Sequence, residues 1–265
     1  MVVLLEFPME GCALVTLNRP QAKNALSSAM RRELVRLFAQ ELPGRARVVV
    51  LTGAGDAFCA GLDLKELGSG GDTAGLIATP ALDAAHAMRA FPGPVIGAVN
   101  GAAITGGLEI ALACDVLLAS ESARFADTHG RVGILPAWGL SQVLPRRIGE
   151  GRAKAMSFTG NFVDAQRAMA WGLVNEVFPA QDLLPAALRM AGDMLGADAA
   201  TLLAYKQLID EGMRLPLGDA LALEQERAGA WALQLSSAGL AQSGAAVTER
   251  GRAQAPVTPA PNSNR

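Results

Sequence analysis

The stretch Pro94-Val-Ile-Gly-Ala-Val-Asn-Gly-Ala-Ala-Ile-Thr-Gly-Gly-Leu-Glu109 carries the strongest structural signal in the chain. Its first six residues are a short apolar run typical of a buried strand, a glycine-containing turn follows, and a helix is expected from about Gly106. A similar stretch, Ala57-Phe-Cys-Ala-Gly-Leu-Asp-Leu-Lys65, follows the apolar run at 47–51. Strands that alternate with helices in this way predict an α/β fold with a largely parallel, buried sheet.

The flanking sequence extends this pattern in both directions. Residues 2–6 and 12–17 alternate around Gly11 and predict a hairpin, while Ser27 is a good N-cap for a helix over about 28–41. A further apolar run at Val116–Ala119 predicts another strand, and we expect a short helix at 164–171 followed by a strand at Leu173–Phe178.

The end of the chain has a different character. From Asp182 onward only helices are expected, at about 182–195, 199–212 and 217–235, and their alanine-rich faces could pack on this chain or on a neighbouring subunit. We therefore divide the chain into an α/β core over 1–180 and a helical region over 181–250. Prolines, asparagines and a serine near the end predict a disordered tail over 251–265.

Composition excludes several classes of function. A net charge of −2 with only 5% aromatic residues offers neither the basic field nor the stacking surface that nucleic acids require. The uncharged stretch 90–108 contains prolines and glycines that would break a lipid-exposed helix, so we expect no membrane partner. The three scattered cysteines predict a cytoplasmic setting without disulfides, where each is either a core residue or a nucleophile: Cys12, Cys59 and Cys114.

The familiar signatures of nucleotide, hydrolase and metal sites are missing from the sequence. There is no G-x-x-x-x-G-K-[ST], no G-x-G-x-x-G after a strand and no G-x-S-x-G. The two histidines, His86 and His129, do not have the spacing of metal ligands. We therefore expect no metal site.

The loops at 57–65 and 100–109 suit catalysis through the main chain. At such turns, unpaired N–H groups can point at a ligand, and the helix start at Gly106 favours negative charge. Glu109 lies three residues further along, on the same helix face. A carboxylate beside an anion hole can move a proton while a neighbouring oxygen carries negative charge. The alternative is that Glu109 is only a charge near a helix N-terminus.

The amino-acid sequence of several segments resembles that of the crotonase family, which is the enoyl-CoA hydratase/isomerase superfamily. The resemblance extends over about residues 3–235, in order and at family-like spacing. It rests on Leu17-Asn-Arg-Pro…Asn24-Ala-Leu26, Leu51-Thr-Gly…Ala57-Phe-Cys-Ala-Gly-Leu-Asp-Leu64, Pro94-Val-Ile-Gly-Ala-Val-Asn-Gly101, Gly106-Gly-Leu-Glu109, Ala113-Cys-Asp-Val116, Thr159-Gly160 and Gly172-Leu-Val174.

The resemblance implies a crotonase-like ββα spiral core with a helical C-terminal part suited to trimer assembly. It also implies that the backbone N–H groups of Leu62 and Gly106 bind a thioester oxygen, and that Glu109 activates water. Coenzyme A, as part of an acyl-CoA substrate and not a separate cofactor, would lie against the residues Ala22, Lys23, Ala60, Asp63, Leu64 and Lys65. From its residue type, Asp63 either holds its own turn or touches substrate.

His129 occupies the position where hydratases of the family carry a second glutamate. Three interpretations remain open: His129 replaces that glutamate as proton donor, Asp127 does so, or the second group is lost. Trp138 also replaces a smaller residue, and it either packs in the core or forms a wall of the acyl pocket.

The resulting expectation is a cytoplasmic enoyl-CoA hydratase that adds water reversibly to a 2-enoyl-CoA. Its assembly would be a homotrimer or a dimer of trimers. The alternatives are double-bond isomerisation or other enolate chemistry on acyl-CoA, and a non-catalytic acyl-CoA-binding protein.

Overall fold

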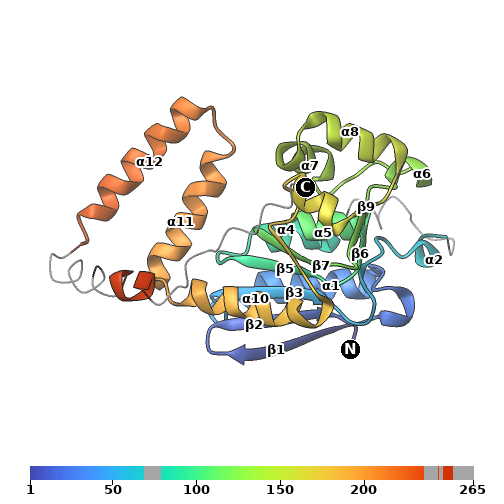
Figure 1. Cartoon of the computed structure of the whole chain (residues 1–265), viewed down its shortest axis with the longest axis horizontal. Helices are drawn as coiled ribbons and strands as arrows, with labels where there is room; N and C mark the ends of the chain where they lie inside the picture. Colours follow the sequence, from blue (N-terminus) through green and yellow to red (C-terminus); the bar gives the residue numbers. More distant parts are fainter. Residues whose placement is uncertain (69–78, 236–243, 245–246, 253–265) are drawn as a thin grey trace, which may run out of the picture. The chain divides into compact units, whose positions relative to one another are not determined.

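The structure is a computed structural model that describes residues 1–68, 79–235, 244 and 247–252. The chain forms two compact units, Met1–Lys206 and Gln207–Arg265. The first unit extends beyond the boundary that we placed at residue 180, because helix α10 (Ala180–Leu195) packs on the main sheet. The first unit contains both β-sheets (Figure 1). Every residue of the predicted site falls within its range, Met1–Lys206.

The main sheet has six strands in the order β1-β2-β3-β5-β7-β10. Strands β1 and β2 form the expected antiparallel hairpin, and the neighbours from β2 to β10 are parallel. The strands are β1 (Val3–Met9), β2 (Cys12–Leu17), β3 (Val48–Gly53), β5 (Val95–Val99), β7 (Val116–Ser120) and β10 (Glu176–Phe178).

A second sheet, in the order β4-β6-β8-β9, is built from very short strands. They are β4 (Ala57–Cys59), β6 (Ala102–Ile104), β8 (Arg124–Ala126) and β9 (Val163–Asp164). The strands β3, β5 and β7 of the main sheet are each followed by one short strand of the second sheet and then by helix. This repeat is the ββα spiral that the family resemblance implied.

The helices of the first unit confirm most of the predicted elements. Ser27 caps α1, because its hydroxyl accepts from the Met30 N–H at 3.3 Å, and the helix continues past Arg36 as a π-helical turn. The helical segments are η1 (Pro20–Ala22), α1 (Ser28–Arg36), η2 (Leu37–Glu41), α2 (Leu64–Leu67), η3 (Pro80–Leu82), α4 (Ala84–Arg89), α5 (Gly106–Leu112), α6 (His129–Val132), α7 (Leu140–Ile148), α8 (Glu150–Thr159), α9 (Ala165–Ala170) and α10.

Both faces of the main sheet are covered, which explains why its strands read as unbroken apolar runs. One face packs Val48, Val50 and Ile96 against Leu183 and Ala187 of α10. The opposite face belongs to a larger core shared with α1, α4 and α5. The three cysteines are buried in these two cores, and burial raises the pKa of each thiol, to about 11 for Cys12 and about 12 for Cys59.

The second unit holds the end of α11 (Ala199–Gly212) and α12 (Leu217–Ala232), joined by an ion pair between Glu211 and Arg227 at 2.8 Å. Neither helix contains a buried residue. Of the tail expected to be disordered, residues 253–265 lie outside the described residues, and 251–252 end a helical segment at 247–252. In the described part of the chain, no helix is both long and apolar enough to cross a membrane.

Candidate active site

The two glycine-containing loops lie side by side and bring Leu62 and Gly106 together. A Cβ placed on Gly106 would lie 3.5 Å from the Leu62 nitrogen, and one on Gly61 would lie 3.3 Å from the Gly106 nitrogen. Among the described residues, the hydrogen bonds of these loops use neither the Leu62 N–H nor the Gly106 N–H as a donor. Two neighbouring unused donors can bind one carbonyl oxygen that gains negative charge.

Close backbone approaches explain why glycine occupies these loops. A Cβ on Gly107 would lie only 2.0 Å from the carbonyl oxygen of Cys59, and one on Gly61, where φ is +94°, would lie 2.8 Å from that of Ile104. Any larger residue would push the start of α5 away from the loop after β4. The glycines therefore set the separation of the two donors.

Thr105 links the start of α5 to the segment that carries His129, a role that we did not predict from the sequence. Its backbone has a φ of +54°, which is strained for a β-branched residue. Its hydroxyl is 2.5 Å from that of Thr128 and accepts from the Thr128 N–H at 3.2 Å. No sequence signal marks this link, since both threonines look like ordinary loop residues.

Glu109 lies in α5, and its side chain is almost completely buried. Only 2% of its surface is exposed, and its Oε1 accepts hydrogen bonds from the main-chain N–H groups of Trp138 (2.8 Å) and Leu140 (3.3 Å). Burial raises the pKa of Glu109, and the Trp138 N–H and the nearby His129 oppose this only in part. A carboxyl group held in this way is suited to proton transfer nearer neutral pH.

His129 is fixed by Asp127 and faces Glu109. Asp127 Oδ1 lies 2.7 Å from His129 Nδ1 and accepts from the His129 main-chain N–H at 3.1 Å. Burial alone would raise the pKa of Asp127, but hydrogen bonds from His129 and Ser157 hold it below its usual value. An ionised carboxylate can only accept, so Nδ1 carries the hydrogen and Nε2 is left facing Glu109 Oε2 at 3.7 Å.

The residues expected to contact coenzyme A lie on two neighbouring segments, the early loop at 22–23 and the first oxyanion loop at 60–65, and they make different contacts. The Ala60 N–H donates to the Lys23 carbonyl at 3.0 Å, which joins the early loop to the first oxyanion loop. The ammonium of Lys23 is paired with Asp56 at 2.5 Å, whereas Lys65 is exposed. A pocket of about 580 Å³ lies here, and the residues that line it are Arg19, Gln21, Ala22, Ala25, Asp63, Leu64, Lys65 and Glu66.

Asp63 holds its own turn, which was one of the two alternatives for it. Its side chain accepts from the N–H groups of Lys65 and Glu66 and so caps α2. It also forms an ion pair with Arg19 at 2.9 Å. These contacts stiffen the wall of the 580 Å³ pocket.

Asn24, which is buried, and Asn100, which is half-buried, brace the loops, and we assigned them no role from the sequence. Asn24, at a φ of +54°, donates to the carbonyls of Ala54 (2.9 Å) and Ala57 (2.8 Å). Asn100 accepts from the Gly53 N–H at 3.0 Å. The available signal was an asparagine in a turn, after η1 for Asn24 and after β5 for Asn100, since asparagine tolerates left-handed backbone and bonds to nearby main chain.

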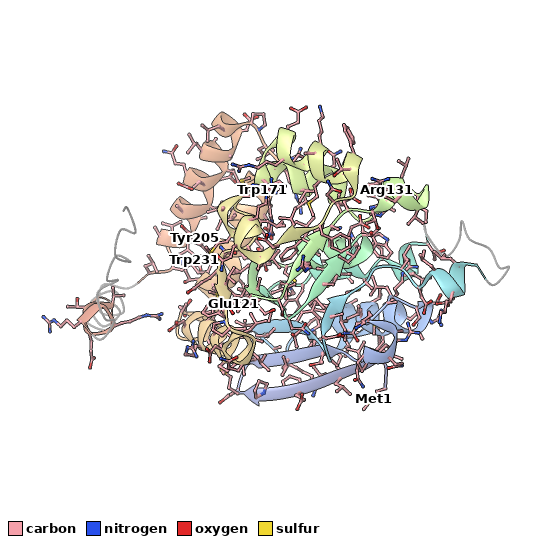
Figure 2. All side chains as sticks on the ribbon, turned by 45° about the vertical axis from the view of Figure 1, so that its right-hand side comes forward. Met1, Glu121, Arg131, Trp171, Tyr205 and Trp231 are labelled. Carbon is pink, nitrogen blue, oxygen red and sulfur yellow. The ribbon has the colours of Figure 1, made fainter. Side chains whose placement is uncertain are left out.

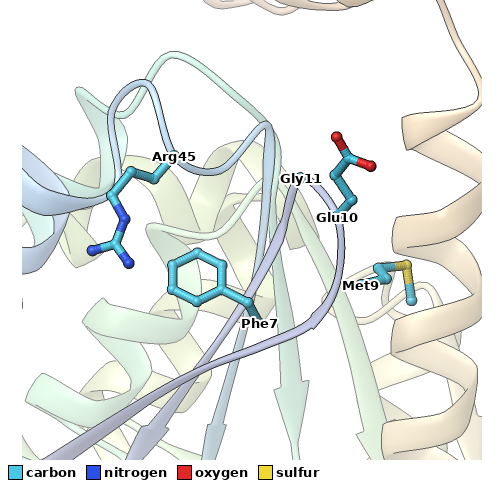
Figure 3. A pocket seen from close by; sticks show the side chains of 5 residues that line it. All are labelled: Phe7, Met9, Glu10, Gly11 and Arg45. Carbon is cyan, nitrogen blue, oxygen red and sulfur yellow. The ribbon is translucent and has the colours of Figure 1, made fainter.

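A further pocket, of about 400 Å³, lies at the β1–β2 hairpin and contains none of the predicted site residues. Figure 3 shows the side chains that line it, which are Phe7, Met9, Glu10, Gly11 and Arg45, with the Arg45 guanidinium 4.8 Å from the centre of the Phe7 ring. In the described part of the chain, no group of three or more His, Cys, Asp or Glu side chains is arranged to hold a metal ion.

Comparison with known proteins identifies the family of this chain. Residues 8–244 match the family model described as enoyl-CoA hydratase/isomerase. The chain belongs to this family. A curated relative, the probable enoyl-CoA hydratase 1 (peroxisomal) of Arabidopsis thaliana, is 41% identical over 83% of this chain and 83% of its own length.

Solved structures of the enoyl-CoA hydratase/isomerase family show the same crotonase fold. The enoyl-CoA hydratase of Bacillus anthracis has a TM-score of 0.80 at 34% identity, and the match covers 86% of this chain and 90% of that one. A monofunctional enoyl-CoA isomerase of M. smegmatis has a TM-score of 0.72 at 37% identity, with 83% and 98% covered. The family acts on acyl-CoA thioesters, so this chain is an acyl-CoA enzyme of the hydratase/isomerase type.

Proposed function

We propose that this enzyme is an enoyl-CoA hydratase, which adds water reversibly to the double bond of a 2-enoyl-CoA. The observation that carries the proposal is the pair formed by Glu109 Oε2 and His129 Nε2, 3.7 Å apart and both buried, beside the two unused main-chain donors. Hydration moves one proton off water and one proton onto carbon. Two facing acid–base groups suit that reaction.

In the proposed reaction, the thioester oxygen lies between the N–H groups of Leu62 and Gly106. Glu109 accepts a proton from water while the water oxygen bonds to C3, and the electron pair of the double bond moves onto the thioester oxygen as an enolate. His129, protonated at Nε2, delivers a proton to C2. The proton on Glu109 then returns to His129, so the net change is the addition of one water molecule.

The pocket beside Ala22, Leu64 and Lys65 is the proposed position of the CoA moiety. Lys65 is the better candidate for a phosphate contact, because Asp56 already neutralises Lys23. Coenzyme A enters as part of the substrate, so the proposed reaction needs no separate cofactor. We also propose a homotrimer or a dimer of trimers as the assembly.

Double-bond isomerisation is the main alternative within the family, since it needs only one group to move a proton between C2 and C4. One of the structural neighbours is a monofunctional enoyl-CoA isomerase, so isomerisation occurs on the same fold. Isomerisation through Glu109 alone would give His129, the second facing group, no role in the reaction. A non-catalytic acyl-CoA-binding protein would need neither group.

The test is an absorbance assay of the enoyl thioester with crotonyl-CoA. We expect turnover by the wild type and a loss of about 10²- to 10⁴-fold in Glu109→Gln, the range for a positioned acid–base group. An unchanged absorbance with wild-type protein rules out hydration. Turnover of a 3-enoyl-CoA would then indicate isomerisation, and retained binding of butyryl-CoA without turnover of either substrate would indicate a binding protein.

A further inference from the structure

The indole of Trp138 lies directly against the oxyanion site. A Cβ placed on Gly106 would lie 3.2 Å from Trp138 Cζ3, so the ring edge already fills the space beside the Gly106 Cα. The main chain of Trp138 also donates to Glu109 Oε1 at 2.8 Å. One residue therefore touches both the oxyanion donor and the proposed base.

Arg31 covers the face of this indole ring and holds it in place. Its guanidinium carbon is 4.6 Å from the ring centroid, and its Nε donates to the Leu82 carbonyl at 2.8 Å. Arg31 is 1% exposed, and burial lowers its pKa to about 10, so it stays charged at neutral pH. A buried cation over a tryptophan face is a strong form of this contact. Arg89 adds a hydrogen bond to the Trp138 carbonyl at 2.9 Å.

The cavity that Leu62 and Arg31 share in lining is small. Its volume is about 10 Å³, which is about the room that one water molecule needs. Trp138 itself is 4% exposed. An acyl chain that grew toward Trp138 would have to displace a packed indole ring, which a close-packed interior resists.

We propose that Trp138, positioned by Arg31, is the end wall of the acyl pocket and restricts the enzyme to short-chain 2-enoyl-CoA substrates. This inference rests on the proposed hydratase function. With the thioester oxygen between Leu62 and Gly106, C2 and C3 must lie within reach of Glu109. Trp138 lies beside both groups, with its main chain bonded to Glu109 and its indole against Gly106, and we place the carbons beyond C3 against the indole.

The test compares kcat/KM for crotonyl-, 2-hexenoyl- and 2-decenoyl-CoA in the wild type and in Trp138→Ala. We expect the wild type to prefer crotonyl- over 2-decenoyl-CoA by about 100-fold or more, and Trp138→Ala to lower that ratio at least about tenfold. Trp171→Ala is the matched control. Trp171, labelled in Figure 2, follows α9, and the guanidinium groups of Arg152 and Arg167 lie over its ring. Its removal should leave the ratio unchanged.

Arg31 is tested as a positioning residue through the same ratio. Arg31→Met should lower the preference for crotonyl-CoA, and Arg31→Lys, which keeps a cation over the ring, should restore part of it. A merely structural role would lower all rates together and leave the ratio unchanged. An unchanged ratio in both Trp138→Ala and Arg31→Met overturns the proposal.

A binding measurement separates this inference from the proposed reaction. Calorimetry with butyryl- and decanoyl-CoA needs no turnover, so it applies even if hydration fails. We expect the wild type to bind butyryl-CoA at least about tenfold more tightly than decanoyl-CoA. Trp138→Leu, which keeps an apolar side chain should the alanine variant not fold, should bind decanoyl-CoA more tightly than the wild type. Equal binding of both esters by the wild type overturns the proposal.

Discussion

At Glu109 the chain holds an ionisable side chain almost entirely out of water, and such a position has a cost in stability. Two main-chain N–H groups bind its Oε1, but burial still raises its pKa. The folded protein therefore holds this proton more tightly than the unfolded chain does. The carboxyl group favours the folded state most at low pH, and that contribution is lost as the pH rises through the raised pKa.

Glu109→Gln should consequently raise the melting temperature at neutral pH, because the amide keeps an acceptor for both N–H groups and carries no charge. The expected rise is about 2–4 °C for each kcal/mol of burial cost that is relieved. The rise should shrink as the pH falls. Thermal unfolding by circular dichroism across a pH series measures it, with the exposed Glu150→Gln as control. A lower melting temperature for Glu109→Gln at neutral pH would contradict the argument.

Asp127 is the other residue whose replacement separates chemistry from folding. Asp127→Asn can still accept from the His129 main-chain N–H, but it removes the negative charge beside the imidazole. We expect kcat on crotonyl-CoA to fall by about 10²- to 10⁴-fold with little change in KM. Because the pKa of Asp127 is held below its usual value, wild-type kcat should fall only at low pH, where this carboxylate takes up a proton. That acid limb of the kcat–pH profile should be absent in Asp127→Asn, which cannot ionise.

The control for this experiment is Asp164→Asn, because Asp164 only caps α9 through the Arg167 N–H at 2.8 Å. Its kcat and pH profile should match those of the wild type. A pH profile in Asp127→Asn that keeps its wild-type shape would show that Asp127 does not act through His129.

Sequence reasoning named several of these residues but not the contacts between them. Glu109, Leu62 and Gly106 could be proposed as site residues because the segments that hold them, 57–65 and 100–109, have a recognisable pattern. The bond between His129 and Asp127 depends on how the segment after β8 turns into α6, and the Arg31–Trp138 contact joins residues more than a hundred positions apart. Spacing along the chain carries no information about such contacts.

At the scale of secondary structure, the site depends on α5 and the loop after β4 meeting without side chains between them. Gly107→Ala would place a Cβ 2.0 Å from the Cys59 carbonyl oxygen, and neither backbone can move freely. We expect the free energy of unfolding to fall by about 1–3 kcal/mol or more. Activity should be lost as well. Urea unfolding and the crotonyl-CoA assay measure the two effects.

Gly151→Ala is the matched control, since it lies within α8 and a Cβ there meets nothing within 4 Å. It should gain about 0.5–1 kcal/mol, because alanine favours a helix over glycine. Equal free energies of unfolding for the two alanine variants would contradict the claim that the loop after β4 and the start of α5 leave no room for a Cβ on Gly107.

The same scale shows why some elements could be predicted and others not. The buried strands β3, β5 and β7 are five or six residues long and read as apolar runs. The partner strands β4, β6 and β8 have only three residues each, too few to show a period. Helix α10 looked like the start of a separate helical region, and only its packing on the sheet places it in the first unit.

For the whole molecule, the second unit raises the question of what covers its helices. Helix α12 has no buried residue, and Leu217 and Leu221, one turn apart, are 75% and 56% exposed. Helices of this length are marginal in water without packing of an apolar face. The proposed homotrimer or dimer of trimers offers a second copy of this chain to cover that face, since burying one leucine side chain is worth about 1.5–3 kcal/mol.

Sedimentation velocity tests this assembly directly. We expect the wild type to sediment as three or six copies of the 27.4 kDa chain, and the double variant Leu217→Glu/Leu221→Glu to shift toward the monomer, because each charge would have to be buried in the interface. Ala230→Glu, at an exposed position of α12 on the opposite side by helical spacing, should keep the wild-type mass. A wild type that sediments as a monomer at micromolar concentration would refute the proposed assembly, and an unchanged mass in the double variant would move the interface away from this face of α12.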